Sequence, residues 1–226
     1  MIEAGHVIVT GASGALGRVV SAGLARRGAR VIGIGRGTPP QQAGVAHAIG
    51  GIDLADPASV ATAIEEVRQS TDRLAGLVNL AGAFAWEQAS EGRLETWHRM
   101  YRDNLAATVA VSQAALPLLR AGKGAIVNVG AAAAARAGAG MAAYAAAKSG
   151  VARLTEGLAE ELKDEGVRVN AVLPSIIDTP ANRAAMPDAD FDRWVRPDAL
   201  EKVIAFLLSD EAEAVTGACI RVTGRV

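Results

Sequence analysis

The sequence has little cysteine, few aromatic residues and no excess of charge of either sign, and each shortage argues against a class of protein. The single cysteine, Cys219, has no partner for an internal disulfide, so we expect a reducing, cytoplasmic environment. The 23 basic and 24 acidic residues give a net charge of −1 without a long run of either sign, which argues against nucleic acid or a membrane as a partner. The three histidines lie far apart without the spacing of metal ligands, so no metal site is expected.

Neither a membrane span nor a signal peptide is expected. No apolar run approaches the length needed to cross a bilayer, and the N-terminal stretch MIEAGHVIVTG leads directly into a strand. The function is therefore expected to reside in a site within a compact domain.

Of the 226 residues, 50% are hydrophobic, and we interpret residues 1–226 as a single domain with a sizeable core. Short runs of continuous apolar residues, which suit strands buried on both faces, alternate with helical stretches. This alternation predicts an α/β fold: a Rossmann-like, doubly wound parallel sheet of about seven strands with helices on both faces. The expected strands are His6–Thr10, Arg30–Ile34, Ala46–Gly51, Gly76–Leu80, Ala125–Val129, Arg168–Leu173 and Cys219–Val222. The expected helices are Ala15–Arg27, Pro57–Ser70, Leu94–Ala121, Ala142–Glu165 and Asp198–Leu208.

Two segments depart from this alternation. Residues 131–140 are rich in alanine and glycine, and we expect a tight connection there. Residues 178–197, DTPANRAAMPDADFDRWVRP, contain three prolines and have no helical or strand periodicity. We interpret this second segment as an insertion that covers the substrate.

The first strand leads into TGASGALG, residues 10–17, and then into a helix. Glycines at 11, 14 and 17 allow a sharp turn and a close approach of the backbone to a pyrophosphate, which the helix N-terminus also favours. This position between the first strand and the first helix predicts dinucleotide binding.

The end of the second strand indicates which dinucleotide is bound. An acidic residue there would bind both ribose hydroxyls and repel a 2′-phosphate, but this chain has Gly35 followed by Arg36. A guanidinium can bind phosphate and stack on adenine, so NADP(H) is favoured over NAD(H). The alternative is that Arg36 is a solvated loop cation.

With TGASGALG, NLAG at 79–82, Asn104, the pair Tyr144 and Lys148, and LPSIIDTP at 173–180, the chain resembles the short-chain dehydrogenase/reductase family over nearly its whole length. The resemblance implies that Asp53 lies near adenine and that Thr179 contacts the nicotinamide carboxamide. Together, the motifs give these expected cofactor-binding residues: Gly11, Ser13, Gly14, Ala15, Leu16, Gly17, Arg36, Asp53, Leu54, Asn79, Ala81, Gly82, Tyr144, Lys148, Pro174, Ile177 and Thr179.

A narrower resemblance concerns the dihydropteridine reductases of that family. The stretch VLPSIIDTPANRAAMPDADFDRW, 172–194, is similar to their DTP…NR…MP.ADF..W pattern, and GM..Y...K is matched by residues 140–148. These enzymes also have GA, here Gly130-Ala131, where other members have paired serines. The chain departs from them at Gly35, where they carry an acidic residue and prefer NADH. It also has Phe84 where they carry a tryptophan, with Trp86 two residues on.

Three residues are the expected catalytic group. Tyr144 and Lys148 are four apart on a helix and project from one face, so the ammonium is expected to lower the pKa of the phenol. Tyr144 would then donate a proton as hydride arrives. On spacing alone, a surface contact would be the preferred interpretation of such a pair. By resemblance, Asn104 holds a water in a proton relay to the lysine, with an ordinary polar helix residue as the alternative.

Ala131 stands where a ketone reductase of this family has a serine that binds the carbonyl oxygen. An alanine cannot stabilise a developing alkoxide, whereas a quinonoid dihydropterin is already electron-poor and needs mainly positioning and a proton. Phe84 and Trp86 alternate onto one side of an extended segment and are expected to stack on a flat substrate beside Ala131, with Trp194 as a third candidate. Packing or a subunit contact is the alternative for these rings.

The function predicted from the sequence is NAD(P)H-dependent transfer of hydride to a flat, activated heterocycle such as quinonoid dihydropteridine. One alternative is a general carbonyl or 3-oxoacyl reductase in which another donor, such as Ser175, replaces the serine. The other is a non-catalytic nucleotide-binding protein. The expected partner is a small-molecule substrate, and the alanine-rich helices 94–121 and 142–165 imply, with the family resemblance, a homodimer or homotetramer.

Overall fold

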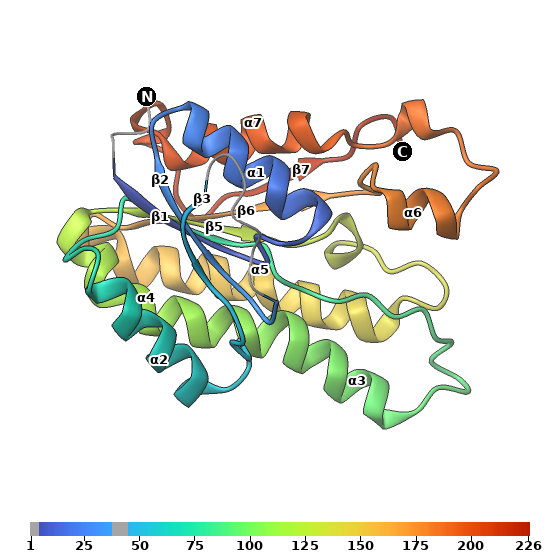
Figure 1. The fold of residues 1–226 in the computed structure, drawn as a ribbon. Helices are drawn as coiled ribbons and strands as arrows, with labels where there is room; N and C mark the ends of the chain where they lie inside the picture. Colours follow the sequence, from blue (N-terminus) through green and yellow to red (C-terminus); the bar gives the residue numbers. More distant parts are fainter. Residues whose placement is uncertain (1–4, 38–44) are drawn as a thin grey trace.

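The seven predicted strands form one parallel sheet in the computed structural model, which describes residues 5–37 and 45–226 (Figure 1). The order is β3-β2-β1-β4-β5-β6-β7, so the chain winds outward in both directions from the centre. This order confirms the predicted doubly wound fold. The strands are β1 (His6–Thr10), β2 (Arg30–Ile34), β3 (Val45–Ile49), β4 (Gly76–Asn79), β5 (Ala125–Val129), β6 (Arg168–Pro174) and β7 (Cys219–Val222).

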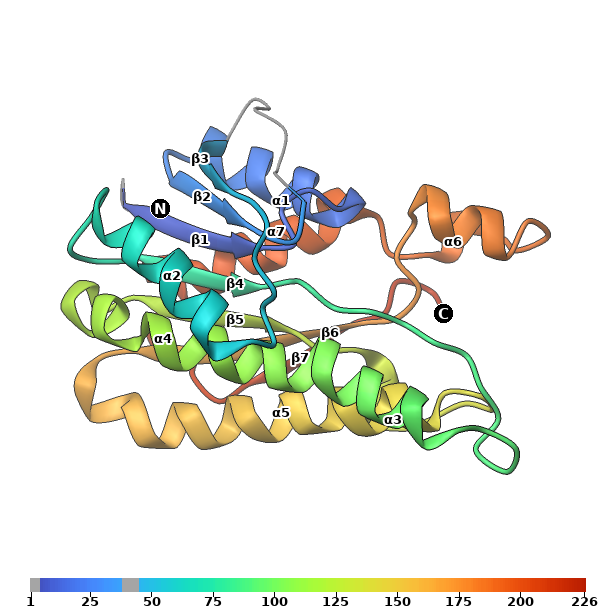
Figure 2. The ribbon, with the colours of Figure 1, turned by 60° about the horizontal axis from the view of Figure 1, so that its bottom comes forward.

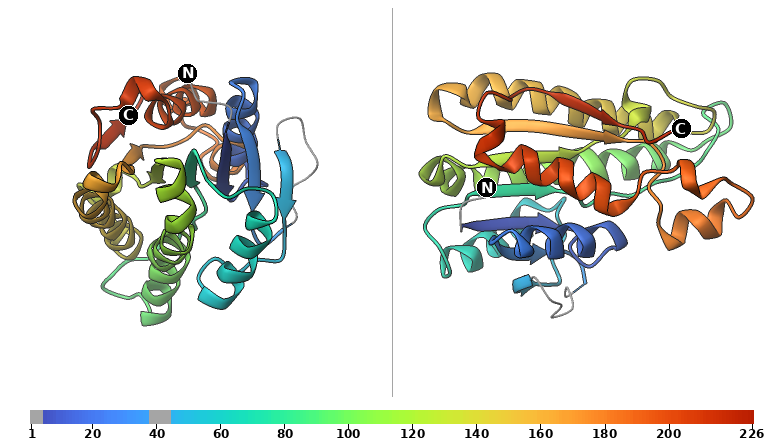
Figure 3. Two further views of the ribbon diagram at one scale, coloured as in Figure 1. Left: turned by 90° about the vertical axis from the view of Figure 1, so that its left-hand side faces the viewer. Right: turned by 90° about the horizontal axis from the view of Figure 1, so that it is seen from above.

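Alternate residues of the strands feed two separate apolar clusters, one on each face of the sheet. In β1, Ile8 packs into one cluster while its neighbours Val7 and Val9 pack into the other. Helices α2 (Pro57–Arg68), α4 (Ala107–Gly122) and α5 (Ala142–Leu162) cover the first face, and α1 (Ala15–Arg26) and α7 (Pro197–Leu208) cover the second (Figures 2 and 3). Burial on both faces explains why the strands are continuous apolar runs.

The long helix predicted at 94–121 is interrupted. It begins as α3 (Leu94–Met100), widens into a π-helical turn, η1 (Tyr101–Ala106), and continues as α4. A π-helical turn is rare and is frequent at functional sites. Here it contains Asn104, whose side chain bonds a segment 21 residues earlier in the chain. The sequence pattern of the helix alone does not reveal this contact.

The composite helix Leu94–Gly122 also corrects an expectation about membranes. At 29 residues this helix is long and apolar enough, by length and composition, to cross a bilayer. No stretch of that kind was expected from the sequence. However, Val111, Ala115 and Leu119 belong to the cluster that packs under the sheet. Core helices of soluble proteins meet the same criterion, so this helix is weak evidence for a span.

The segment predicted to cover the substrate follows β6 as a closed excursion. It contains a short helix, α6 (Pro180–Ala185), and a 3-10 turn, Phe191–Arg193. A parallel bridge between Ile177 and Val195 closes its base, where Asp178 N–H donates to the Val195 carbonyl at 2.9 Å. The excursion is therefore tied at its neck.

The C-terminal residues hold this excursion from outside. The Arg225 N–H donates to the Arg193 carbonyl at 2.9 Å, and the Arg193 guanidinium donates back to the Arg225 carbonyl at 2.7 Å. The Arg225 guanidinium reaches the Asp192 carbonyl at 2.8 Å. This reciprocal set of bonds joins the tail after β7 to the turn at 191–193.

Candidate active site

A cavity of about 1420 Å³ opens at the carboxyl ends of the strands, where α/β sheets of this kind bind ligands. The glycine-rich loop lines one end, α6 and the 131–140 segment line the other, and Tyr144 and Lys148 lie in its wall. Of the residues expected to bind cofactor, all but Gly17 and Asn79 line this cavity. The topology thus gathers motifs that are far apart in the sequence.

The glycine-rich loop is shaped for close approach by a ligand. Gly11 has a φ of +68°, and a Cβ there would lie 3.0 Å from Ala81 Cα. Gly17 does not face the cavity, contrary to expectation; its role is packing, because a Cβ there would overlap the Gly11 carbonyl. Helix α1 begins at Ala15, and its N-cap residue Gly14 provides no side-chain cap, so the unpaired amides of the first turn remain available where Gly14, Ala15 and Leu16 line the cavity.

The end of β2 has room for a side chain that the sequence does not supply. A Cβ on Gly35 would meet nothing nearer than the Gly37 carbonyl at 3.8 Å. The missing carboxylate is therefore not excluded by crowding. The exposed Arg36 lines the same part of the cavity, as the prediction for a 2′-phosphate requires.

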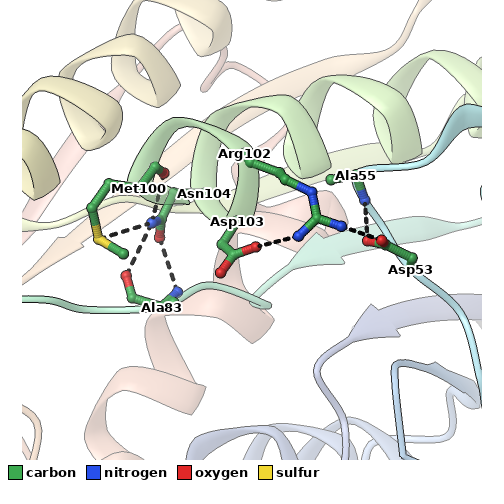
Figure 4. A network of polar contacts seen from close by, with 7 residues as sticks. All are labelled: Asp53, Ala55, Ala83, Met100, Arg102, Asp103 and Asn104. Carbon is green, nitrogen blue, oxygen red and sulfur yellow. Dashed lines mark hydrogen bonds and ion pairs between the residues drawn. The ribbon is translucent and has the colours of Figure 1, made fainter. Parts of the chain in front are cut away.

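The predicted adenine residue, Asp53, is part of an ionic network (Figure 4). Its carboxylate accepts from the Arg102 guanidinium and from the Ala55 N–H at 3.1 Å. Arg102, from the π-helical turn, also contacts Asp103 at 3.4 Å. Both acidic side chains that line the cavity within the described ranges are thereby paired with one arginine.

In the predicted catalytic pair, Lys148 is buried and Tyr144 is partly buried, and desolvation controls the pKa of both groups. Lys148 Nζ donates to the Val129 carbonyl at 2.8 Å and lies 5.9 Å from the centroid of the Tyr144 ring. Desolvation lowers the pKa of Lys148 to about 8. Desolvation also raises the pKa of Tyr144 to about 12. The expectation that the lysine lowers the phenol's pKa is wrong for this structure, because burial outweighs the attraction of an ammonium committed elsewhere.

Asn104 is fully buried and satisfied within the protein (Figure 4). Its amide nitrogen donates to the carbonyls of Ala83 and Met100, each at 3.0 Å, and its Oδ1 accepts from the Ala83 N–H at 3.3 Å. A Cβ on Gly82 would lie 2.7 Å from Asn104 Oδ1 and 3.3 Å from Lys148 Nζ. Gly82 therefore allows both side chains to approach the cavity wall.

Ala131 lines the cavity and is only 6% exposed, so its methyl group leaves this wall without a donor. The alternative donor, Ser175, also lines the cavity, but its Oγ donates to the Thr223 carbonyl at 2.8 Å. Its hydroxyl hydrogen is thus already used.

The aromatic residues divide into two groups. Phe84 and Trp86 are 58% and 60% exposed and line the cavity, while Ala83 before them and Ala85 between them pack against a small buried cluster, as strand-like alternation predicts. The Phe84 ring meets the Tyr144 ring edge to face, with centroids 5.0 Å apart. Trp194 is 6% exposed, packs against Phe191 and does not line the cavity. It belongs to the packing of the excursion, contrary to expectation.

Several residues near the site were not identified from the sequence. The Thr10 hydroxyl accepts the N–H groups of Leu80 and Ala81 at 3.0 and 3.1 Å, which ties the glycine-rich loop to the next strand end. Asn79, in contrast, was expected to bind the cofactor, but its amide donates to Ser112 and Asn128 within the framework, each at 2.9 Å. Its place beneath the site explains why it does not reach the cavity. Thr10, directly before the first glycine, is a hydroxyl at a strand end and could have been singled out.

The model of the family described as short chain dehydrogenase matches residues 5–190. The chain belongs to the short-chain dehydrogenase/reductase family. This short-chain dehydrogenase is 31% identical to the 3-oxoacyl-(acyl-carrier-protein) reductase FabG of Escherichia coli strain K12, over 96% of this chain and 95% of that protein. It is 35% identical to the inactive 2-(S)-hydroxypropyl-CoM dehydrogenase 2 of Xanthobacter autotrophicus, over 77% of this chain and 82% of that protein.

Solved structures support the same assignment for this short-chain dehydrogenase. The ligand-free aldohexose dehydrogenase of Thermoplasma acidophilum superposes with a TM-score of 0.90 and 27% identity, covering 99% of this chain and 94% of that one. The chain is therefore an NAD(P)-dependent oxidoreductase. The names of these three relatives refer to different substrates, and none of them is a dihydropteridine reductase. The comparisons therefore support the family and not the narrower resemblance.

In this short-chain dehydrogenase, the residues that line the cavity fit a nicotinamide dinucleotide. The backbone of Gly11 and Gly14 in the cavity lining, the uncapped start of α1 and the adjoining Arg36 suit a pyrophosphate and an anionic ribose. Among residues 5–37 and 45–226, no group of three or more histidine, cysteine or acidic side chains could hold a metal ion. Tyr144 and Lys148 line the same cavity.

Proposed function

We propose that this enzyme uses NADPH to reduce a flat, conjugated acceptor, such as a quinonoid dihydropterin or a quinone. The observation that carries the proposal is the cavity wall at Ala131, which offers a methyl group where a carbonyl reductase needs a donor, in a cavity that Phe84 and Trp86 also line. An electron-poor ring needs a surface to stack on and one proton donor, and both are present.

Within this proposal, the bound reduced nicotinamide supplies the hydride and becomes the oxidised cofactor. Tyr144 donates its Oη proton to the acceptor atom that gains electron density, so hydride and proton together complete a two-electron reduction. The raised pKa of Tyr144 keeps the phenol protonated, which suits reduction. The Lys148 ammonium, 5.9 Å from the Tyr144 ring centroid, attracts the phenolate that Tyr144 becomes but does not outweigh its desolvation, so the phenolate regains a proton from solvent.

Turnover of three acceptor classes tests the proposal: quinonoid dihydropterin, quinones and simple ketones, each with NADPH and NADH. We expect the first two classes to be reduced with a kcat/KM at least about a hundred-fold above that of ketones, the order of rate that a missing oxyanion donor costs. Preferential reduction of ketones or 3-oxoacyl thioesters would contradict the proposal. It would favour the carbonyl reductase activity that the name of the E. coli relative describes.

A non-catalytic role is the second candidate, because one relative at 35% identity is named as inactive. The arrangement of Tyr144 and Lys148 in the cavity wall argues for catalysis in this chain. Cofactor binding without turnover of any of the three acceptor classes would favour the second candidate.

The preference for NADPH is tested at Arg36. Arg36→Ala is expected to weaken NADPH binding by about ten- to a hundred-fold, since it removes a charge-assisted hydrogen bond of about 1.5–3 kcal/mol, and to leave NADH binding nearly unchanged. Equilibrium titration of both cofactors measures this. Arg26→Ala, an exposed arginine in the last turn of α1, is the control and should change neither affinity. Equal losses for both cofactors would mean that Arg36 does not read the phosphate.

Ala131→Ser tests whether the missing serine is a defect. The added hydroxyl can bind a ketone oxygen, so ketone reduction should rise by about ten-fold or more while quinone or pterin reduction stays level or falls. A buried hydroxyl without a partner would also cost about 1–3 kcal/mol of stability, which thermal unfolding would detect. Ala137→Ser, at an exposed position of the same segment, is the matched control. A large gain in pterin or quinone turnover would overturn the interpretation.

Assembly and location remain part of the proposal. We infer a homodimer or homotetramer in a reducing cytosol, from the alanine-rich helices α4 and α5 and the single cysteine. Sedimentation of the purified enzyme decides between the two assemblies.

A further inference from the structure

The charges that line the cavity are unevenly distributed. Its acidic side chains, Asp53 and Asp103, lie toward the predicted adenine end and are both paired with Arg102. At the other end, Arg136 and Arg221 line the cavity. Neither of them makes a hydrogen bond or ion pair with a side chain, a backbone carbonyl or the C-terminal carboxylate in the part of the chain that the structure describes.

The strand register places Arg221 beside the reacting end of the cavity. Val129 pairs with Val172, and Leu173, the next residue of β6, pairs with Arg221. Arg221 therefore lies at the level of the sheet where Gly130 and Ala131 follow β5.

The packing of its neighbours also fixes which face of the sheet Arg221 lies on. Ile220 and Val222 pack into the cluster under α1 and α7, so the residues between them face the opposite way. Cys219, two residues before Arg221, directs its Sγ toward the Ala152 carbonyl of α5 at 4.0 Å. Arg221 thus shares the face of the sheet on which α5 carries Tyr144.

Arg136 approaches the same region from the 131–140 segment. The Ser149 hydroxyl donates to the Ala134 carbonyl at 2.8 Å, which fixes this segment against α5 shortly before Arg136. Every other residue from 131 to 140 is alanine or glycine. Arg136 is therefore the one long side chain that this wall of the cavity can present to a ligand.

We propose that the substrate carries a carboxylate-like anionic substituent, which Arg136 and Arg221 bind while the ring is reduced beside Tyr144. Guanidinium groups bind planar anions through paired hydrogen bonds, and unpaired cations in a cavity raise the local concentration of anions. The inference rests on the proposed function for the ring and adds the charge class of its substituent. It assigns no chemical step to either arginine.

The experiment compares an acid with its primary amide in two acceptor classes. The quinone pair is 3-(3-methyl-1,4-naphthoquinon-2-yl)propanoate and its amide, and the ketone pair is 4-oxopentanoate and its amide. Because acid and amide share the same reacting group, the ratio of their kcat/KM values reports recognition of the anion. We measure this ratio for the wild type, Arg136→Gln, Arg221→Gln, the double variant and Arg73→Gln, an exposed arginine outside the cavity paired with Asp72.

The wild type is expected to prefer the acid about twenty-fold. Each single variant should lower the preference about five-fold, the most that one solvent-exposed ion pair supplies, and the double variant should abolish it. Raising the salt concentration should reduce the wild-type preference, and Arg73→Gln should keep it. A wild-type ratio near one, or an unchanged ratio in the double variant with a wild-type melting temperature, would overturn the inference.

The two proposals fail in different ways. If only the ketones are reduced, the proposed acceptor class is wrong, and the acid-to-amide ratio for the ketone pair still judges the arginines. If no acceptor is reduced, isothermal titration measures how tightly the NADPH-loaded protein binds naphthalene-2-carboxylate and naphthalene-2-carboxamide. The ratio of these two affinities then reports recognition of the anion. A loss of that ratio in the double variant supports the inference, and equal binding of acid and amide contradicts it.

Discussion

Tyr144→Phe is expected to lower the turnover number several hundred-fold, roughly, with almost no change in cofactor affinity. The substitution removes the Tyr144 hydroxyl, the proposed proton donor in the cavity wall, and keeps the ring, including its edge-to-face contact with Phe84. General acid catalysis is worth about 10²–10⁴-fold, which sets the size of the effect. Steady-state kinetics with the best acceptor and a cofactor titration measure the two quantities.

The chain supplies its own control for this change. Tyr101 is the other of its two tyrosines, 57% exposed on the π-helical turn, and Tyr101→Phe should leave turnover unchanged. A Tyr144→Phe enzyme with wild-type rates would show that the proton comes from another group. A parallel loss of cofactor affinity would show instead that the hydroxyl is needed for binding.

Lys148→Met is expected to lower kcat/KM by at least about a hundred-fold and to change the pH profile. The pKa of Lys148 is lowered to about 8, so its ammonium is present below that pH and is lost as the pH rises through it. Wild-type kcat/KM for reduction should therefore be flat near neutrality and decline above about pH 8. Tyr144, with its pKa raised to about 12, stays protonated across this window and contributes no decline.

The pH profile separates a chemical role of Lys148 from a purely structural one. In Lys148→Met the decline near pH 8 should disappear, whereas Lys202→Met, an exposed lysine of α7, should keep the wild-type profile. A decline that persists in Lys148→Met would assign it to another group. Circular dichroism and thermal unfolding show whether loss of the bond to the Val129 carbonyl also alters the fold.

The strands were predictable because burial on both faces leaves a strong local signal. β1, β2, β5 and β7 begin and end where the apolar runs do, β4 and β6 differ by one residue at the C-terminal end, and β3 differs by one residue at its start and two at its end. The glycine loop and the Tyr144 helix were placed for the same reason, since each motif lies directly beside an element with a clear pattern. The parallel topology then brought them together at the carboxyl ends of the strands.

What the sequence did not reveal depends on contacts between distant segments. The π-helical turn arises where Asn104 bonds Ala83, and nothing within the helix marks that partner. The pKa of Tyr144 depends on how completely the surrounding segments exclude water, which spacing does not determine. Trp194 was misplaced because a segment without periodicity does not indicate which way a ring turns.

The bonds between the C-terminal tail and the turn at 191–193 have a practical consequence for handling the enzyme. Val226 lines the cavity, and Arg225 is held against the excursion, which contributes residues to the same lining. An affinity tag fused after Val226 would therefore begin at the mouth of the cavity and compete with ligands for that space. The other end of the chain enters β1 at the amino edge of the sheet, so purification handles, fluorescent labels and surface-immobilisation linkers belong on the N-terminus.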